Sequence, residues 1–115
     1  MAAPDVFPPD HFNAGVLYIK PSMETFRYLL MKSQTTPSYD GGDTGFLNAL
    51  WQQEWWNSLE QRLDFGYNAQ RFTVKRTDAY WKEVERLGLK IIHYSSSPKP
   101  WDSMKGGSDL EVIWY

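Results

Sequence analysis

Residues 12–24 read FNAGVLYIKPSME, and this stretch decides the fold. Its first part, Phe12 to Lys20, is rich in β-branched and aromatic residues and stops at Pro21, which is typical of a short buried strand. Ser22 is then a favoured N-cap residue, and Glu24 places a carboxylate in the first helical turn. The stretch therefore predicts a strand followed directly by a helix.

The remainder of the chain continues this α/β order. Apolar residues at helical spacing extend the first helix to about Ser33, and residues 33–42 are rich in Ser, Thr, Pro and Gly, which predicts a loop. Three further segments have the patterns of regular elements. They are a helix from Phe46 to Trp51, a helix from Tyr80 to Leu87 that ends before Gly88, and a buried strand from Leu89 to Tyr94. Two strands are few for such a sheet, which usually has about four to six, so we expect an incomplete sheet.

Composition is that of a globular chain and excludes several functional classes. With 42% hydrophobic and 23% charged residues the 115-residue chain can form a core, and its 17% aromatic residues suit both cores and sugar contacts. The formal net charge of -2 offers no broad cationic field for nucleic acid, and no apolar run approaches the roughly 18 residues of a membrane span. Cysteine is absent. We therefore expect a cytoplasmic protein with no nucleic-acid or membrane partner.

Four short segments in this frame match a known family in both order and spacing. They are Ala2-Ala3-Pro4-Asp5 running to Phe12-Asn13-Ala14-Gly15-Val16, then Lys20-Pro21-Ser22 with Glu24-Thr25, then Asp40-Gly41-Gly42-Asp43, and finally His93 with Lys99-Pro100-Trp101. Leu47-Asn48 and Phe65-Gly66-Tyr67-Asn68 lie between them. Together these segments resemble glycosyltransferase family eight, and most closely its glycogenin-type members.

The resemblance implies both a fold and an activity. Residues 1–115 would form the C-terminal part of a catalytic domain with a Rossmann-like nucleotide-diphospho-sugar transferase fold and a mixed sheet. The enzyme would be a retaining hexosyltransferase of glycogen biosynthesis that uses UDP-glucose and a divalent ion, which the resemblance implies to be Mn²⁺. Its partners would be the nucleotide-sugar donor and a protein or glycan acceptor, and the full-length protein would be able to form a homodimer.

By the same resemblance, five residues of the first half line the donor site: Asn13, Ala14, Asp40, Asp43 and Thr44. Asp43 is the expected catalytic residue, because it can also steady the charge that develops as the diphosphate leaves. Asp40 is equally suited to cap the helix that follows it, and Asn13 to satisfy backbone groups at the start of the strand. Thr44 stands where the family has Gln and offers no amide, so rate or donor preference would differ.

Three residues of the second half would face the diphosphate. His93 is the expected metal ligand, and the alternative is a strand-end histidine hydrogen-bonded to its neighbours. Lys99 presents a compact positive charge to phosphate oxygens, and its alternative is an ordinary solvated lysine. Ser96, at a position where the family has Gly, would contact the nucleotide through its backbone.

Two parts of the family's site are missing from this sequence. No Asp-x-Asp follows an apolar strand, and the resemblance places that metal-binding pair and the uridine-binding segment upstream of Met1. Residues 69–77 contain no tyrosine, although glycogenin-type enzymes glucosylate one of their own there. The nearest, Tyr80, is expected to pack on a helix. Self-priming is therefore unsupported, and catalysis by this chain alone is not expected.

Two other function classes remain open. A metal-independent carbohydrate-binding module would explain the aromatic residues, above all Trp51, Trp55 and Trp56, although such a cluster more often belongs to a core. An inactive scaffold fragment without a ligand is the second.

Overall fold

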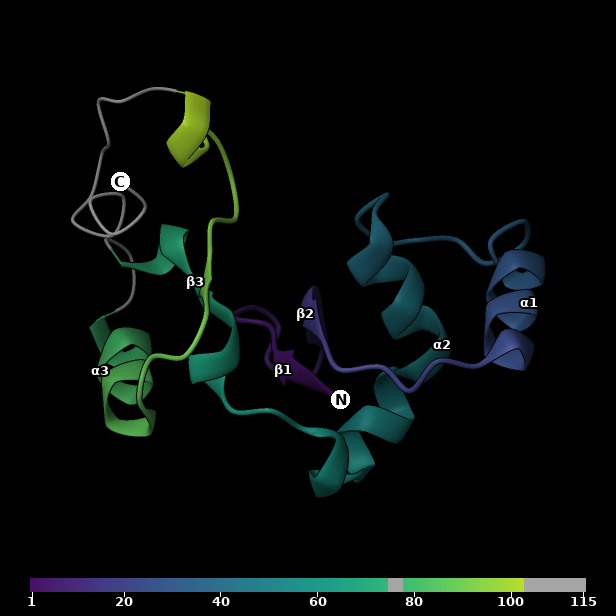
Figure 1. Ribbon diagram of the computed structural model, residues 1–115, viewed down its shortest axis with the longest axis horizontal. Coiled ribbons are helices and arrows are strands. Elements are labelled where there is room, and N and C mark those ends of the chain that lie inside the picture. The colour runs from purple at the N-terminus through teal and green to yellow at the C-terminus, as the bar shows by residue number, and fades with distance from the viewer. Residues whose placement is uncertain (75–77, 103–115) are drawn as a thin grey trace. The chain divides into compact units, whose positions relative to one another are not determined.

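The computed structural model describes residues 1–74 and 78–102, and the chain divides into two compact units, Met1–Asp64 and Phe65–Tyr115 (Figure 1). The first unit contains strands β1 (Ala2–Pro4) and β2 (Phe12–Leu17), helices α1 (Met23–Lys32) and α2 (Asp43–Asn57), and a 3-10 turn at Leu59–Gln61. The described part of the second contains β3 (Ala69–Gln70), α3 (Asp78–Leu87), β4 (Ile92–His93), and 3-10 turns at Phe65–Asn68, Arg71–Thr73 and Pro100–Asp102.

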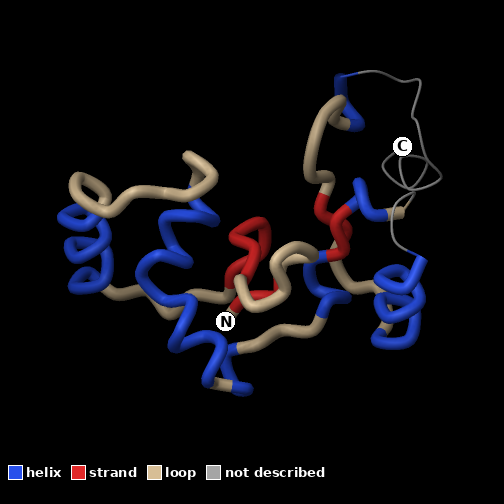
Figure 2. The backbone as a smooth tube through the Cα atoms, turned by 180° about the vertical axis from the view of Figure 1, so that it is seen from behind, coloured by secondary structure: helices blue, strands red, loops and turns tan. Residues whose placement is uncertain are grey.

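The strands of the described residues form two small sheets, one antiparallel and one parallel, drawn in red in Figure 2. In the first unit β1 and β2 run antiparallel, with Ala2 opposite Leu17 and an irregularity before Pro4 meets Phe12. In the second unit β3 and β4 run parallel, with Gln70 opposite His93. The α/β class is therefore confirmed, and both strand directions occur, in two separate two-stranded sheets.

Local signals placed the first helix correctly. The Ser22 hydroxyl accepts a hydrogen bond from the Thr25 N–H at 3.2 Å, so Ser22 is the N-cap as expected, and the helix ends before Ser33. The preceding strand is shorter than predicted: it ends at Leu17, opposite Ala2, instead of at Lys20, and the last backbone hydrogen bonds of the pair join Met1 to Tyr18.

The prediction of a buried strand from Leu89 to Tyr94 is wrong in length and in burial. Only Ile92 and His93 are in β4, and both are half-buried, whereas Leu89 and Ile91 are exposed. The Lys90 and Ile91 N–H groups both donate to the Gly66 carbonyl, at 2.9 and 3.0 Å, so this apolar run first follows a turn and pairs as a strand only afterwards. The end of α3 is as predicted, since Gly88 has the left-handed φ of 84° that favours glycine after a helix.

An aromatic core holds the first unit together. It consists of Ala2, Phe12 and Trp55, each at most 4% exposed. The Trp55 ring lies 5.7 Å from that of Phe12, and its indole N–H donates to the Ala2 carbonyl at 3.0 Å. Trp55 therefore belongs to the core, as expected of the tryptophan cluster, whereas Trp56 is 41% exposed.

The core of the second unit is more polar. Fully or nearly buried Val84 and Tyr80 of α3 are accompanied by buried polar residues, which are Asn68, Gln70, Arg71 and Thr73. The Tyr80 hydroxyl donates to the Asn68 carbonyl at 3.1 Å, and its ring lies 5.2 Å from that of Phe65. The expectation that Tyr80 packs on a helix is thus confirmed.

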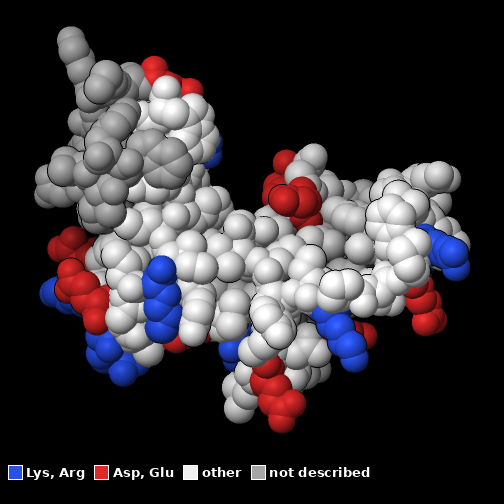
Figure 3. Space-filling view, viewed as in Figure 1, with Lys and Arg blue, Asp and Glu red and all other residues white. Residues whose placement is uncertain are grey.

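The described surface carries charges of both signs. Figure 3 shows lysine, arginine and carboxylate side chains scattered over the face in view, with no continuous basic patch among the described residues of that face. Within the same part of the chain, no helix combines the length and apolar character needed to cross a membrane.

Candidate functional site

Asp40 organises the loop that leads into α2. Its Oδ1 accepts hydrogen bonds from the Ser38 hydroxyl at 2.6 Å and from the N–H groups of Gly42 and Gly45 at 2.8 and 3.0 Å. The Ser38 hydrogen bond, helped by the two backbone donors, lowers the pKa of the Asp40 carboxyl. Gly42, and not Asp40, is the N-cap residue of α2. Asp40 still has the expected capping role, because its carboxylate accepts from the Gly45 N–H in the first turn of the helix. The carboxylate is thus fixed and ionised at the helix N-terminus.

Gly41 in this loop and Gly45 in the first turn of α2 are required by that arrangement. Gly41 has a left-handed φ of 73°. A Cβ at Gly45 would lie 2.5 Å from both Asp40 Oδ1 and Ser38 Oγ, which no real side chain tolerates. The turn therefore closes tightly around one carboxylate oxygen.

Asp43 is the first residue of α2 and is exposed. Its Oδ1 accepts from the Thr44 N–H at 2.8 Å, so the carboxylate sits at the positive end of the helix dipole. Asp43 therefore exposes a negative charge to solvent at the start of a helix. This is the geometry needed to steady positive charge, or to accept hydrogen bonds from a sugar hydroxyl.

The first half of β2 meets the start of α2. The Ala14 N–H donates to the Thr44 hydroxyl oxygen at 3.0 Å, across 30 positions of sequence. Beside it, the Asn13 side chain donates to Asp5 Oδ2 at 3.0 Å and accepts from the Gly15 N–H at 2.9 Å. The structure therefore brings Asn13, Ala14, Asp43 and Thr44 into one neighbourhood. Asn13 also accepts from a backbone N–H, which is the structural role expected as the alternative to sugar binding.

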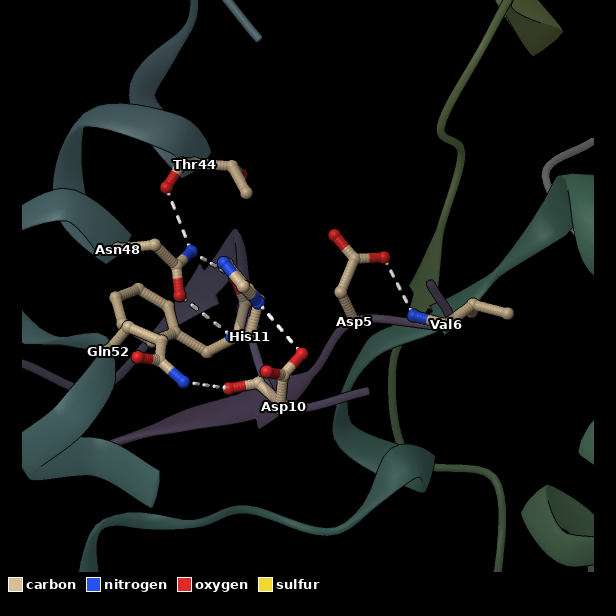
Figure 4. A network of polar contacts seen from close by, with 8 residues as sticks. Asp5, Val6, Asp10, His11, Thr44, Asn48 and Gln52 are labelled. Carbon is tan, nitrogen blue, oxygen red and sulfur yellow. Dashed lines mark hydrogen bonds and ion pairs between the residues drawn. The ribbon is translucent and has the colours of Figure 1, made fainter. Parts of the chain in front are cut away.

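Other polar residues of the first unit gather close to this neighbourhood, although no motif drew attention to most of them (Figure 4). His11 Nδ1 lies 2.9 Å from Asp10 Oδ1, and the His11 ring packs edge-on against Tyr39, with centroids 5.4 Å apart. Burial raises the pKa of Tyr39, and the carboxylates of Asp40, Asp5 and Asp10 raise it further. Asp5 and Asp40 lie in recognised segments, whereas Asp10, His11 and Tyr39 carried no functional signal in the sequence.

The residues expected at the diphosphate lie in β4 and in the loop that follows it. His93 lies in β4, half-buried, opposite Gln70. Lys99 turns back onto this loop, where its ammonium donates to the Tyr94 carbonyl at 2.6 Å. Ser96 has a left-handed φ of 65°, which explains why a glycine suits this position.

A buried arginine holds the same loop. Arg71 is 8% exposed, and its guanidinium donates to the Ser95 carbonyl at 3.2 Å and to the Ser96 hydroxyl at 3.3 Å. Sequence reasoning missed Arg71, because a single arginine in a polar stretch gives no sign that it will be buried.

The described residues do not complete a divalent-metal site. His93 can supply one nitrogen ligand, but residues 1–74 and 78–102 contain no group of three or more His, Asp or Glu side chains placed to hold an ion. Hard divalent ions prefer several oxygen ligands. The described residues can therefore supply one ligand to a divalent ion but not a complete coordination sphere.

Comparison with known proteins places this arrangement in a family. No protein-family model matches the chain. Over 104 residues it is 41% identical to "Glycogenin-1" of Caenorhabditis elegans, covering 87% of this chain and 23% of that protein. Over 113 residues it is 34% identical to "Glycogenin-2" of Homo sapiens, covering 96% and 22% respectively. The chain is homologous to a region of the glycogenins.

The likeness extends beyond glycogenins but with lower identity. Over 93 residues the chain is 28% identical to the "Putative UDP-glucuronate:xylan alpha-glucuronosyltransferase 3" of Arabidopsis thaliana, covering 78% of this chain and 15% of that protein. The resemblance to glycogenin-type glycosyltransferases is thus confirmed. The chain spans about a quarter of the length of the two glycogenins named above.

Proposed function

We propose that this chain is the C-terminal part of the catalytic domain of a retaining hexosyltransferase, which transfers glucose from UDP-glucose to a protein or glycan acceptor. Glycogenin relatives that match most of the chain support the transferase class. A nucleotide-sugar donor agrees with the Arabidopsis relative, whose name specifies UDP-glucuronate. Glucose, as opposed to another hexose, rests on the glycogenin likeness alone.

The observation that carries the proposal is the hydrogen bond between the Ala14 N–H and the Thr44 hydroxyl. It joins the Asn13-Ala14 segment to the start of α2, where Asp43 lies exposed. Two of the four recognised motifs, separated in sequence, are therefore neighbours in the fold. A carbohydrate-binding platform of tryptophans is less well supported, because Trp55 is buried in the core.

The residues divide into two roles under this proposal. Asn13, Ala14, Asp40 and Thr44 surround the sugar, with Asp43 as the catalytic carboxylate. Lys99 and the backbone at Ser96 contact the diphosphate, and His93 offers a nitrogen to a divalent ion, which we take to be Mn²⁺. When bound, that ion would neutralise charge on the leaving diphosphate.

The transfer breaks the bond between the anomeric carbon and the UDP oxygen and forms one from that carbon to an acceptor hydroxyl oxygen on the same face. The bonding electrons leave with UDP, and the hydroxyl proton passes to a leaving-group oxygen. Asp43, fixed at the N-terminus of α2, is placed to steady positive charge that develops on the sugar ring.

The test compares two carboxylates of the same helix in the full-length protein that contains this chain. Asp43→Asn keeps the shape of the side chain but removes its charge, so UDP release from UDP-glucose should fall by about a hundredfold or more. Glu54→Gln, on the exposed part of α2, should retain the parental rate.

Equal rates in Asp43→Asn and its parent would contradict the proposed role of Asp43, and a parent that releases no UDP would contradict the function as a whole. Titration of the isolated 115-residue chain with UDP and MnCl₂ should show weak binding at most, because the sequence contains no Asp-x-Asp. Binding of a glycan without metal would favour the carbohydrate-binding alternative.

A further inference from the structure

Three polar side chains of α2 form hydrogen bonds with the backbone of β2 and of the residues just before it. The Gln52 side-chain amide donates to the Asp10 carbonyl at 2.8 Å. The Asn48 amide accepts from the Phe12 N–H at 3.1 Å and donates to the Phe12 carbonyl at 2.7 Å. Thr44 accepts from the Ala14 N–H at 3.0 Å. Figure 4 shows Thr44, Asn48 and Gln52 following one another along one side of the helix.

The spacing of these contacts has a geometric cause. Thr44, Asn48 and Gln52 are four residues apart, so they share one face of the helix and are separated by a rise of about 6 Å each. Alternate residues of a strand point the same way and are separated by about 6.7 Å. A helical stripe with a spacing of four therefore matches Phe12 and Ala14 of β2, and its third member, Gln52, reaches Asp10 in the turn just before the strand.

The other edge of residues 10–14 faces β1 and Asp5, the residue that follows β1. The His11 carbonyl accepts from the Asp5 N–H at 2.8 Å, so its backbone polar group points away from α2. Phe12 points both of its backbone groups at the single Asn48 amide, which replaces the N–H and C=O of a neighbouring strand residue. α2 thus acts as a surrogate strand for an edge that would otherwise lack partners in this unit.

Asn48 is the central contact of this stripe. It is 4% exposed, and its amide makes a further hydrogen bond to the Thr44 carbonyl at 2.8 Å, within its own helix. A buried amide held by three hydrogen bonds has one orientation, because any other would leave buried donors and acceptors unpaired. The stripe is therefore rigid at its middle.

We propose that Thr44, Asn48 and Gln52, which we call the α2 ladder, are positioning residues that fix the register of residues 10–14 against α2. This proposal rests on the proposed function, under which Asn13 and Ala14 contact the donor sugar together with residues at the start of α2. Asn48 and Gln52 lie one and two turns behind Thr44 and act on the sugar only through the strand. A slip of the strand by one residue would point Asn13 to the opposite face.

The experiment separates Asn48 and Gln52 from their neighbours in the full-length protein that contains this chain. Asn48→Leu and Gln52→Leu remove the side-chain hydrogen bonds but keep a side chain of similar volume. The matched control is Gln53→Leu, because Gln53 has the same chemistry one position along the helix but is exposed. Three quantities are measured in each variant: amide hydrogen exchange at Ala14, the KM for the donor and the KM for the acceptor.

We expect faster exchange at Ala14 in Asn48→Leu, although the Ala14 N–H bonds to Thr44 and not to Asn48. The donor KM should rise about tenfold or more, as small misplacements of a binding group can cause, while the acceptor KM stays at its parental value. Gln52→Leu should shift the Ala14 exchange and the donor KM in the same direction but less, since Gln52 is only half-buried and makes one hydrogen bond. Gln53→Leu should match the parent.

Each failure points to a different error. Parental exchange at Ala14 in both ladder variants would overturn the ladder as a unit, and faster exchange with an unchanged donor KM would overturn its positioning role. If Asn48→Leu does not fold, Gln52→Leu carries the same comparison. A parent that uses no nucleotide sugar contradicts the proposed function, whereas the exchange result still supports or overturns the ladder.

Discussion

The two units hold their candidate site residues by different means. In Met1–Asp64 the core is aromatic, and uncharged side chains of α2 hold the backbone that carries Asn13 and Ala14. In Phe65–Tyr115 the described core is itself polar, and the loop that carries Ser96 and Lys99 is held by a buried guanidinium. In the first unit the residues that form the aromatic core differ from those that position the backbone by hydrogen bonds. In the second unit buried polar residues do both.

This difference has an energetic consequence. In the first unit, removing a polar contact leaves an apolar core that still packs. In the second, Arg71 and Asn68 are part of what is buried, so the loss of one partner leaves other buried groups unsatisfied. Packing changes should therefore matter most in the first unit, and charge or hydrogen-bond changes in the second.

The largest effect is expected from the core of the first unit. Trp55→Ala removes a 3% exposed ring and its hydrogen bond to the Ala2 carbonyl, and should lower the free energy of unfolding by about 3–5 kcal/mol. Trp56→Ala, one position away and 41% exposed, should change it by about 0.5 kcal/mol at most. Urea unfolding followed by circular dichroism measures both. Similar losses for the two tryptophans would remove the distinction between core and surface.

The second prediction addresses the polar unit. Arg71→Met keeps much of the side-chain volume but removes the donors to Ser95 and Ser96, and should destabilise the unit by about 2 kcal/mol. Amide exchange at Ala69, whose N–H donates to the Ile91 carbonyl at 3.0 Å, reports on this unit directly. The control is Arg86→Met, because Arg86 pairs with Glu83 on the surface of α3. Equal exchange in the two variants would show that burial of Arg71 has no energetic weight.

Sequence predicted the parts of the fold that depend on local signals. The first helix was placed to within one residue because Ser22 caps it through its own neighbour Thr25. The end of α3 was placed by Gly88 for the same reason. β1 and β3, only three and two residues long, were missed, since strands this short are defined by their partners and not by their own pattern.

The candidate site was predictable only in part, for a similar reason. Motif resemblance named Asn13, Asp43 and His93, but nothing in single positions showed that Arg71 is buried. The fourfold spacing of Thr44, Asn48 and Gln52 is visible in the sequence, yet it resembles any polar helix face. Its meaning depends on the strand opposite, which only the tertiary structure supplies.

A smaller effect is expected at Asp40, where the sign of the pH dependence is fixed by its hydrogen bonds. The pKa of the folded carboxyl lies below its ordinary value of 3.8, so its contribution is present above that value and is lost as the pH falls through the folded pKa. Because Asp40 is exposed, Asp40→Asn should cost only about 0.5 kcal/mol at neutral pH after solvent screening. Thermal unfolding between neutral and acid pH should bring the two curves together at the acid end. Parallel curves would contradict a lowered pKa.

The smallest effect concerns the left-handed residue of the second unit. Ser96 has φ 65°, a conformation that costs a residue with a Cβ about 1 kcal/mol, and glycine removes this cost. Against it stand the loss of the 3.3 Å hydrogen bond from Arg71 and the greater freedom of glycine in the unfolded chain. The balance should favour Ser96→Gly by about 0.5 kcal/mol, whereas Ser97→Gly should destabilise by a similar amount. If Ser96→Gly is the more harmful change in thermal unfolding, the hydroxyl contact with Arg71 outweighs backbone strain, and the guanidinium holds this loop through Ser96 more than through the Ser95 carbonyl.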